Sequence, residues 1–363
     1  MTMRDKVTSR ERVNLALRRQ EADRIPRAES FWPETLPAWQ QEGMPYGQSP
    51  DELFDYDIVQ AGWVESRAFP GFEEIIREDA ESVVRRDGNA AILRYWKHHS
   101  GTPEHIGFEV DGPDAWPRLR DGFRDIPIGQ RVDLCSTVRA MHKARSRQRW
   151  FCWGGVECFE MAKDILGHEG MCVAAIEEPG WLQEIFETLA DMAVRALDYL
   201  EANGVVYDGG WIYGDVAYNH GPFFSPAMYR ALVLPAQKKQ VAWFKQRGLP
   251  VIYHTDGDFR PLLPMLLELG VDCLQPLEAK ANIDVRALKP AYGDRLAFMG
   301  NIDVTKLLTN DRAVIEEEVA HKIPMAMRGG GYIYHSDHSI PPGVTWSSYL
   351  YLMQLVDFYG RYA

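Results

Sequence analysis

The sequence predicts a (β/α)8 barrel, and two patterns along the chain support this fold class. From about residue 133 onward, helical stretches alternate with short apolar runs, which is typical of βα units around a parallel sheet. Polar residues also follow five successive apolar runs directly. A doubly wound open sheet would spread these polar residues along an edge, whereas a barrel gathers them at one mouth, where barrel proteins keep their chemistry. We therefore expect the barrel.

The N-terminal region begins with a helix. Thr8 and Glu11 have the spacing of a capping box, and apolar residues follow on one helical face. An extended piece over residues 23–31 comes next, and Pro33 starts a second helix that ends near residue 41.

A β-hairpin is expected in the next part of the chain. Residues 82–86 and 90–96 are rich in β-forming residues and flank an Asp87–Gly88 turn. We expect this hairpin, or a larger β-meander near residues 80–120, to be inserted among the barrel elements. Its turn is expected to be exposed and to offer a surface for a homodimer.

The remaining elements follow from the alternation of apolar patterns. Helices are expected at 134–147, 157–166, 180–203, 226–247, 259–269, 285–292, 312–328 and 346–359. Strands are expected at 150–153, 205–212, 250–253, 273–277, 296–299 and 332–334. No linker or low-complexity segment divides the chain, so we expect a single domain over residues 1–363.

The overall charge and the cysteine content exclude several classes of protein. Apolar residues make up 46% and charged residues 25% of the chain, as in ordinary globular proteins. A formal net charge of −12 disfavours binding to nucleic acid or to an anionic membrane surface. The 5 cysteines are odd in number and form no CxxC pair, so we expect a reducing compartment, the cytoplasm. No apolar run is long enough to span a membrane.

The polar residues at the predicted strand ends are the first candidates for a functional site. They are Tyr213 and Asp215, then His254, Asp256 and Asp258, then Glu278, then Asn301 and Asp303, and last His335, Asp337 and His338. Asp258 and Asp303 directly precede helices, where an aspartate usually caps the helix. His254 and His338 lie beside aspartates, so each is either a metal ligand or acid/base group, or a histidine satisfied by structural hydrogen bonds.

Several short segments resemble the uroporphyrinogen decarboxylase superfamily. In chain order they are Asp23-Arg-Ile-Pro26, Val251-Ile-Tyr-His-Thr-Asp-Gly257, Gly270-Val-Asp272, Gly300-Asn-Ile-Asp303, Gly329-Gly-Gly-Tyr-Ile333 and Asp337-His-Ser-Ile-Pro-Pro342. The resemblance covers residues 150–360 and implies a (β/α)8 fold. The superfamily contains true decarboxylases of uroporphyrinogen III and methyltransferases that work with corrinoid proteins.

The decarboxylase alternative has one clear departure. The resemblance implies an N-terminal Arg-Gln-Ala-Gly-Arg stretch that holds the substrate's carboxylates, but residues 26–33 lack it and place Glu29 there. Each lost contact between arginine and a carboxylate forfeits about 1.5–3 kcal/mol. His338 does align with a histidine that the decarboxylases place near their substrate. A decarboxylase or other lyase acting on a small carboxylate is kept as the alternative.

The methyltransferase branch implies a zinc site with a His-x-Cys motif and a later cysteine. Here the first motif reads His254-Thr255-Asp256, and the later position offers His335, Asp337 or His338. Both cysteines are therefore replaced, but His254, Asp256 and His338 remain able to bind zinc. Harder ligands also suit manganese or iron. The alternative is that the metal is lost and these side chains bind the substrate directly.

A methyltransferase or demethylase is the favoured function. Oxygen and nitrogen ligands leave a metal more electrophilic than thiolates do, which favours removing a methyl group from a small substrate and passing it to Co(I) of a corrinoid. The sequence lacks the Asp-x-His-x-x-Gly motif of cobalamin-binding modules, so the corrinoid is expected on a separate protein. A barrel that binds a small molecule without this chemistry is the third reading.

The expected roles of the candidate residues follow from these readings. We expect Asp256, His338 and Glu157 in catalysis, with Asp256 and His338 as an acid/base pair if no metal is bound. The candidates for substrate binding are Trp32, Trp153, Tyr213, Asp215 and Glu278. Glu157 could instead complement a helix dipole, Glu278 could be a solvated charge, and the tryptophans could belong to the core.

Overall fold

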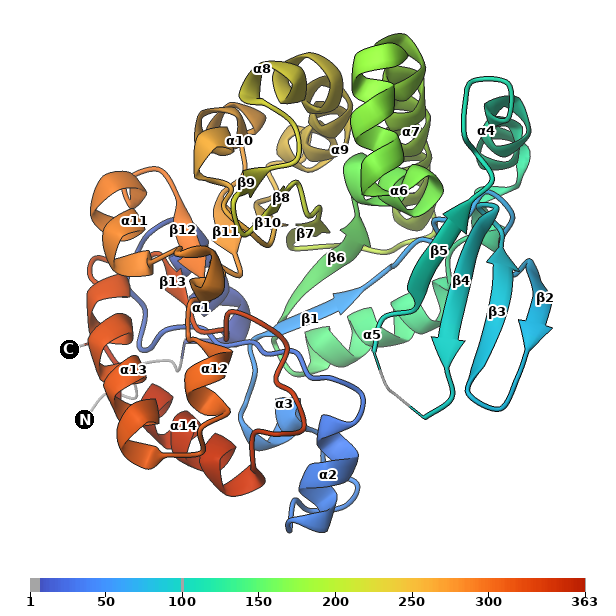
Figure 1. The fold of residues 1–363 in the computed structure, drawn as a ribbon. Coiled ribbons are helices and arrows are strands. Elements are labelled where there is room, and N and C mark those ends of the chain that lie inside the picture. Colours follow the sequence, from blue (N-terminus) through green and yellow to red (C-terminus); the bar gives the residue numbers. More distant parts are fainter. Residues whose placement is uncertain (1–6, 99–100, 363) are drawn as a thin grey trace.

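The computed structural model describes residues 7–98 and 101–362. Its centre is a seven-stranded sheet in the order β1, β6, β7, β10, β11, β12 and β13. These strands span Ile58–Ala61, Trp150–Val156, Gly209–Tyr213, Val251–His254, Cys273–Gln275, Ala297–Met299 and Tyr332–Ile333. Every neighbouring pair is parallel, and the sheet is curled (Figure 1). The predicted α/β fold with a parallel sheet is confirmed.

Helices follow most of the strands and surround the sheet (Figure 1). They are α1 (Ser9–Leu17), α2 (Thr35–Gln41), α3 (Pro50–Leu53), α4 (Trp116–Asp125), α5 (Leu134–Ser146), α6 (Cys158–Glu177), α7 (Pro179–Ala202), α8 (Pro226–Met228), α9 (Leu234–Gln246), α10 (Leu263–Leu269), α11 (Val285–Tyr292), α12 (Val304–Leu307), α13 (Arg312–Ala326) and α14 (Trp346–Tyr359). The capping box of α1 is present, as predicted.

Two expected helices have different bounds. The helix expected at 226–247 is divided by a π-helical stretch at Tyr229–Val233. Pro235 lies just beyond this stretch and has no amide proton for the regular helical hydrogen bond. The helix expected to end near 166 continues to Glu177 across a kink at Gly167, whose φ of 68° no regular helix contains.

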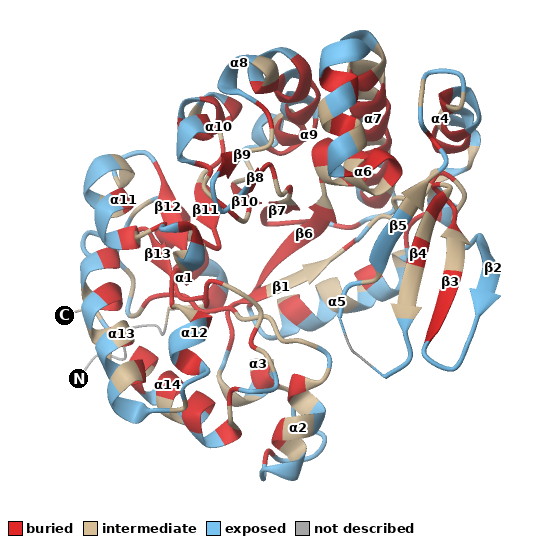
Figure 2. Ribbon diagram, in the orientation of Figure 1, coloured by how far each residue is buried: buried red, intermediate tan, exposed pale blue. Residues whose placement is uncertain are grey.

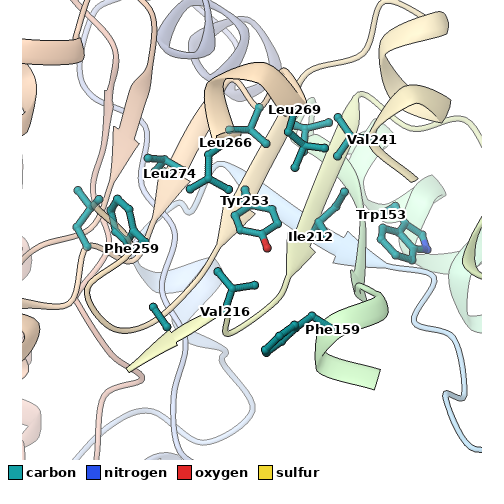
Figure 3. Packing of buried hydrophobic residues seen from close by; sticks show 14 of the residues in the cluster. Trp153, Phe159, Ile212, Val216, Val241, Tyr253, Phe259, Leu266, Leu269 and Leu274 are labelled. Carbon is teal, nitrogen blue, oxygen red and sulfur yellow. The ribbon is translucent and has the colours of Figure 1, made fainter. Parts of the chain in front are cut away.

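The two faces of the sheet pack differently. One face encloses a small apolar core with Ile58, Trp150, Cys152, Trp211, Ile252, Cys273, Ala297, Met299 and Ile333, closed by Val13, Ala16 and Leu17 of α1. The other face packs against the surrounding helices in a much larger core, part of which Figure 3 shows. Figure 2 shows buried residues along β6, β12 and β13 of this sheet and exposed residues on the outer sides of the helices. No helix in the described ranges is long and apolar enough to cross a membrane.

A short extended segment links the two edge strands of the sheet. The amide of Ala28 donates to the carbonyl of Tyr334 at 3.1 Å, and the amide of Tyr334 donates to Pro26 at 2.8 Å. On the other side, the amide of Asp57 donates to the carbonyl of Arg27 at 2.8 Å. Residues 26–28 therefore lie between β13 and β1.

Buried Asp57 holds this segment, α1 and β1 together. Its side chain is fully buried and accepts hydrogen bonds from Arg12 and Arg24, each at 2.7 Å, and from the amide of Arg27 at 2.8 Å. Arg12 is itself almost fully buried. A buried carboxylate is tolerated only when it is paired and fully hydrogen-bonded, and these contacts meet that condition.

A separate antiparallel sheet lies between β1 and β6 in the chain. Its strands, in the order β2, β3, β4 and β5, span Glu73–Glu78, Ser82–Asp87, Ala91–Trp96 and Glu104–Phe108. The expected bounds of 80–120 are therefore wrong at both ends, since α4 occupies Trp116–Asp125. Strand β2 is exposed throughout and has no apolar alternation to reveal it, and ion pairs such as Arg85 with Glu73 connect it to β3.

The turn between β3 and β4 also differs from expectation. Asp87, Gly88 and Asn89 are buried rather than exposed. The carbonyl of Gly88 accepts from the amide of Phe69 at 3.1 Å, and Asn89 accepts from the amide of Ala68 at 2.7 Å. The turn itself is therefore covered by the preceding loop, and the homodimer surface expected around this hairpin stays a prediction.

The role of Asp57 gives a direct stability prediction. Asp57→Asn removes the charge that compensates buried Arg12 and Arg24, so the free energy of unfolding should fall by about 3–5 kcal/mol. The exposed Asp55, which reaches Arg24 at 3.4 Å, provides the matched control: Asp55→Asn should change stability by less than about 1 kcal/mol. Chemical denaturation of both variants measures this, and equal effects would contradict the assignment.

Candidate functional site

Three polar side chains form a row at the carboxyl ends of neighbouring strands. His254, the last residue of β10, is paired in register with Tyr213 of β7 and with Gln275 of β11. Its Nδ1 lies 2.5 Å from Gln275 Oε1, which also accepts a hydrogen bond from Trp211 Nε1 at 3.2 Å. The Tyr213 ring lies 4.7 Å from the His254 ring. Gln275 therefore fixes the orientation of His254.

Two carboxylates face the other nitrogen of His254. Its Nε2 lies 3.4 Å from Asp215 Oδ1 and 3.8 Å from Asp256 Oδ1. The amide of Asp256 donates to Asp215 Oδ1 at 3.0 Å, which ties the two loops together. The three side chains offer one ligand atom each within 4.8 Å of one another.

The electrostatics of this group reflect its close packing. Burial alone would lower the pKa of His254, but the hydrogen bond to Asp215 and the charges of both aspartates raise it to about 9. Burial alone would raise the pKa of Asp215, but its hydrogen bond to His254 and the charge of that ring lower it. Burial raises the pKa of Asp256 to about 6. Without a metal, His254 and Asp215 therefore form an ion pair.

The residues of this group fit a zinc ion. Ligand atoms about 2.0–2.2 Å from a tetrahedral zinc lie roughly 3.4 Å apart, close to the distances from His254 Nε2 to the two aspartates. Asp256 Oδ1 is buried and has no hydrogen-bond partner among the described residues, which fits a role in binding an ion. The predicted third ligand, His338, is partly exposed, and its Nδ1 lies 3.9 Å from Asp256 Oδ2. The close group contains Asp215 in place of His338.

A cavity of about 450 Å³ opens in front of these carboxylates. Its lining residues are Lys163, His168, Asp215, Ala217, Tyr218, Asn219, His220, Phe223, Asp256, Gly257 and Glu278. Glu278 accepts a hydrogen bond from the amide of Gly257 at 2.8 Å. The structure therefore brings together the predicted candidates Asp215, Asp256 and Glu278, with His254 beside them and His338 close to Asp256.

Three other predicted candidates lie outside the cavity lining. Glu157 is buried and caps α6, where it accepts a hydrogen bond from the amide of Phe159 at 3.1 Å, and burial raises its pKa to about 7. Trp153 is fully buried in the outer core with Phe244 (Figure 3). Trp32 is half-buried, and its amide donates to the carbonyl of Ile340 at 3.0 Å. These contacts agree with the structural alternatives for two of the residues: Glu157 lies at a helix N-terminus and Trp153 belongs to the core.

Tyr213 and Glu29 also lie outside the cavity lining. The Tyr213 hydroxyl exchanges hydrogen bonds with the side-chain amide of Gln60, and its ring supports His254 from the side. The side chain of Glu29 is fully buried and accepts from Tyr334 Oη at 2.9 Å and from Ser336 Oγ at 2.7 Å. Glu29 therefore does not reach the cavity.

Sequence reasoning missed an ion pair on α6. Lys163 lines the cavity and contacts Glu160, which in turn accepts from the amide of Asp215 at 3.4 Å. Both lie in the first two turns after β6, so the rule that strand ends carry function could have found them. Lys163 and His168 also line a neighbouring cavity of about 1080 Å³ between α6 and the end of β5. The two cavities adjoin through these residues.

Comparison with known proteins places the chain in a family. A family model for uroporphyrinogen decarboxylase (URO-D) matches residues 153–359. The uroporphyrinogen decarboxylase of Saccharophagus degradans is 29% identical over 166 residues, 44% of each chain. That of Bacillus cereus (strain B4264) is 27% identical over 195 residues, 52% of this chain and 49% of the relative.

Methyltransferases are also similar. The methylated-thiol–coenzyme M methyltransferase of Methanosarcina mazei is 30% identical over 86 residues, 24% of this chain and 22% of that protein. Each of these sequence matches spans less than half of the relative's length. A solved structure of a methyltransferase from Methanosarcina mazei shares the fold, with a TM-score of 0.70 at 16% identity over 97% of this chain and 99% of that chain.

The family match includes the strands and loops that build the candidate site. Asp215, His254, Asp256 and Glu278 all lie within the matched residues. Because the family model covers more than half of the chain, the protein belongs to the uroporphyrinogen decarboxylase (URO-D) family.

Proposed function

We propose that the protein is a methyltransferase that removes a methyl group from a small substrate and passes it to a corrinoid on a separate protein. The observation that carries this proposal is the group of Asp215, His254 and Asp256 at the edge of a small cavity. In the reaction, the bond from the methyl carbon to a heteroatom breaks and its electron pair stays on the heteroatom. The electron pair of Co(I) forms the new bond to carbon.

Asp215, His254 and Asp256 would hold a divalent metal, with zinc as the ion of choice. When bound, the metal would supply a Lewis acid that polarises the heteroatom of the leaving group. Gln275 accepts from His254 Nδ1, so the tautomer with its lone pair on Nε2 is favoured, and this nitrogen faces the two aspartates.

His338 would deliver the proton that the leaving heteroatom needs. It lies beside Asp256 on the outer side of the group, and its partial exposure allows it to exchange protons with water. In this proposal, a role as general acid replaces the predicted role of His338 as the third metal ligand. Glu278, which lines the cavity and is held by the amide of Gly257, would bind the substrate.

The charges of the cavity disfavour the decarboxylase alternative. A substrate with many carboxylates needs several cations, but among the described residues Lys163 is the sole Lys or Arg that lines the cavity, and it contacts Glu160. Arg24 and Arg27, the two arginines of residues 23–33, are occupied elsewhere, since Arg24 pairs with Asp57 at 2.7 Å and Arg27 with Asp357 at 2.9 Å. The carboxylates of Asp215, Asp256 and Glu278 would repel such a substrate.

We also propose that the curled sheet forms a closed (β/α)8 barrel within a single domain over residues 1–363. Residues 26–28 would be the eighth strand, because their backbone hydrogen bonds connect β13 with β1. This closure would bring Ser30 and Gln60 to the same mouth as His254.

Metal analysis tests the site. Protein purified without chelator should contain about one zinc per chain, and His254→Ala should lose it together with methyl transfer, because one of three protein ligands is removed. The control is His321→Ala, since His321 is exposed on α13 and its Nδ1 forms a hydrogen bond with the carbonyl of Glu317, outside the site. This control should keep its metal. Equal metal content in the parent and in His254→Ala would refute the assignment.

The raised pKa of His254 predicts how metal affinity depends on pH. Below about pH 9 the metal-free imidazole carries a proton that must leave when a metal binds. Zinc affinity should therefore rise about tenfold per pH unit between roughly pH 7 and pH 8.5, and this slope should flatten near pH 9. Titration calorimetry in buffers of different ionisation enthalpy measures the proton released. His338→Gln should keep the slope, whereas an affinity that does not change with pH would contradict the ion pair.

A further inference from the structure

The outer wall of the cavity is made of aromatic rings. Tyr218, His220 and Phe223 all line it, and they come from the short hairpin of β8 (Ala217–Tyr218) and β9 (Gly221–Pro222). The Tyr218 ring lies 5.3 Å from that of Phe223 and 5.9 Å from that of His220. His168 of α6 stacks on Phe223 at 4.4 Å. We call Tyr218, His220 and Phe223 the ring wall.

The loop after β10 holds the ring wall over the cavity. The amide of Asp258 donates to the carbonyl of Tyr218 at 2.9 Å. Gly257 has a φ of +78°, and a Cβ at this position would lie 2.6 Å from the backbone of Ala217 and Tyr218. Glycine is therefore required for this close approach. The same Gly257 donates its amide to Glu278, so the ring wall and this carboxylate are fixed relative to each other.

Among the described residues, no side chain balances the negative charge of Glu278. Its carboxylate takes part in no ion pair there, and it accepts a hydrogen bond from the neutral amide of Gly257. Lys163, across the cavity, is matched by Glu160 and also lies in the field of Asp164 and Asp215. Even with a divalent cation neutralising Asp215 and Asp256, the cavity would keep the uncompensated charge of Glu278.

We propose that the ring wall and Glu278 bind an organic cation, so that the substrate carries an ammonium or sulfonium group in addition to the methylated heteroatom that reacts. Aromatic faces attract such cations through the quadrupole of the ring, and a nearby carboxylate adds a direct charge interaction. The cation would occupy the outer part of the cavity, and the heteroatom that loses its methyl group would lie toward Asp215, His254 and Asp256. This inference extends the proposed methyl transfer by naming the substrate class.

Other substrate classes fit these surfaces less well. An anion would meet Glu278 without a free cation to balance it. A neutral apolar molecule of the same shape would gain contact with the rings, but it would leave the Glu278 carboxylate desolvated without a partner, which is costly. The cavity therefore discriminates by charge as well as by shape.

Binding of a matched pair of probes tests the proposal. Choline and 3,3-dimethylbutan-1-ol have nearly the same shape, but only choline carries a charge. Calorimetric titration of the full-length protein, at fixed ionic strength and without corrinoid, should show choline binding about tenfold or more tighter than the neutral alcohol. Phe223→Leu and Glu278→Gln should each weaken choline binding by about 3- to 30-fold, whereas neither variant should bind the alcohol more weakly than the parent does. The glutamine keeps an acceptor for Gly257.

The control variant is Phe358→Leu, which replaces a ring on α14 that is 74% exposed and outside the cavity lining. It should bind choline as the parent does. Equal affinity for the two probes, no choline binding at millimolar concentration, or unchanged affinity in both cavity variants would each overturn the proposal. Because the titration involves no methyl transfer, choline binding without any methylation of a corrinoid would instead refute the proposed function and leave the cation site standing.

Discussion

The parallel register of β7, β10 and β11 is the constraint on which the candidate site depends. It places Tyr213, His254 and Gln275 in one row, and Gln275 then fixes the ring of His254. A slip of one residue would turn His254 toward the outer core and bring apolar Tyr253 to the mouth. The apolar layer beneath the row, with Trp211, Ile252 and Cys273, makes such a slip costly because it would expose the core.

The sequence predicted the parts of the site that follow from strand ends. Asp215, His254, Asp256 and Glu278 each follow an apolar run, and parallel strands bring such positions together. The sequence could not show which residues of β6 face the inner core and which face the surrounding helices, because residues on both faces of this strand are buried and apolar. Trp153 therefore looked like a cavity residue although it belongs to the outer core. The hairpin that carries the ring wall has two-residue strands, too short for any periodic signal.

The proposed preference for methyl transfer over decarboxylation rests on the charges of the cavity. The candidate cavity collects carboxylates and has one lysine that is already paired, while Arg24 and Arg27 stabilise the junction between the edge strands. Arg24 and Arg27 are therefore engaged in stabilising the fold and are not available to bind a polyanion. A cavity with this charge is suited to a metal ion near His254 and to an organic cation near the ring wall.

The most direct test of the central claim is methyl transfer itself. The protein would be mixed with Co(I) corrinoid and a panel of methyl ethers, thioethers and methylamines that also carry an ammonium or sulfonium group. Formation of the methylated corrinoid would be followed by its absorption spectrum. The account predicts methylation with at least one cationic donor, and a loss of about a hundredfold or more in Asp215→Ala. No methylation with any donor, or decarboxylation of a porphyrinogen under the same conditions, would contradict it.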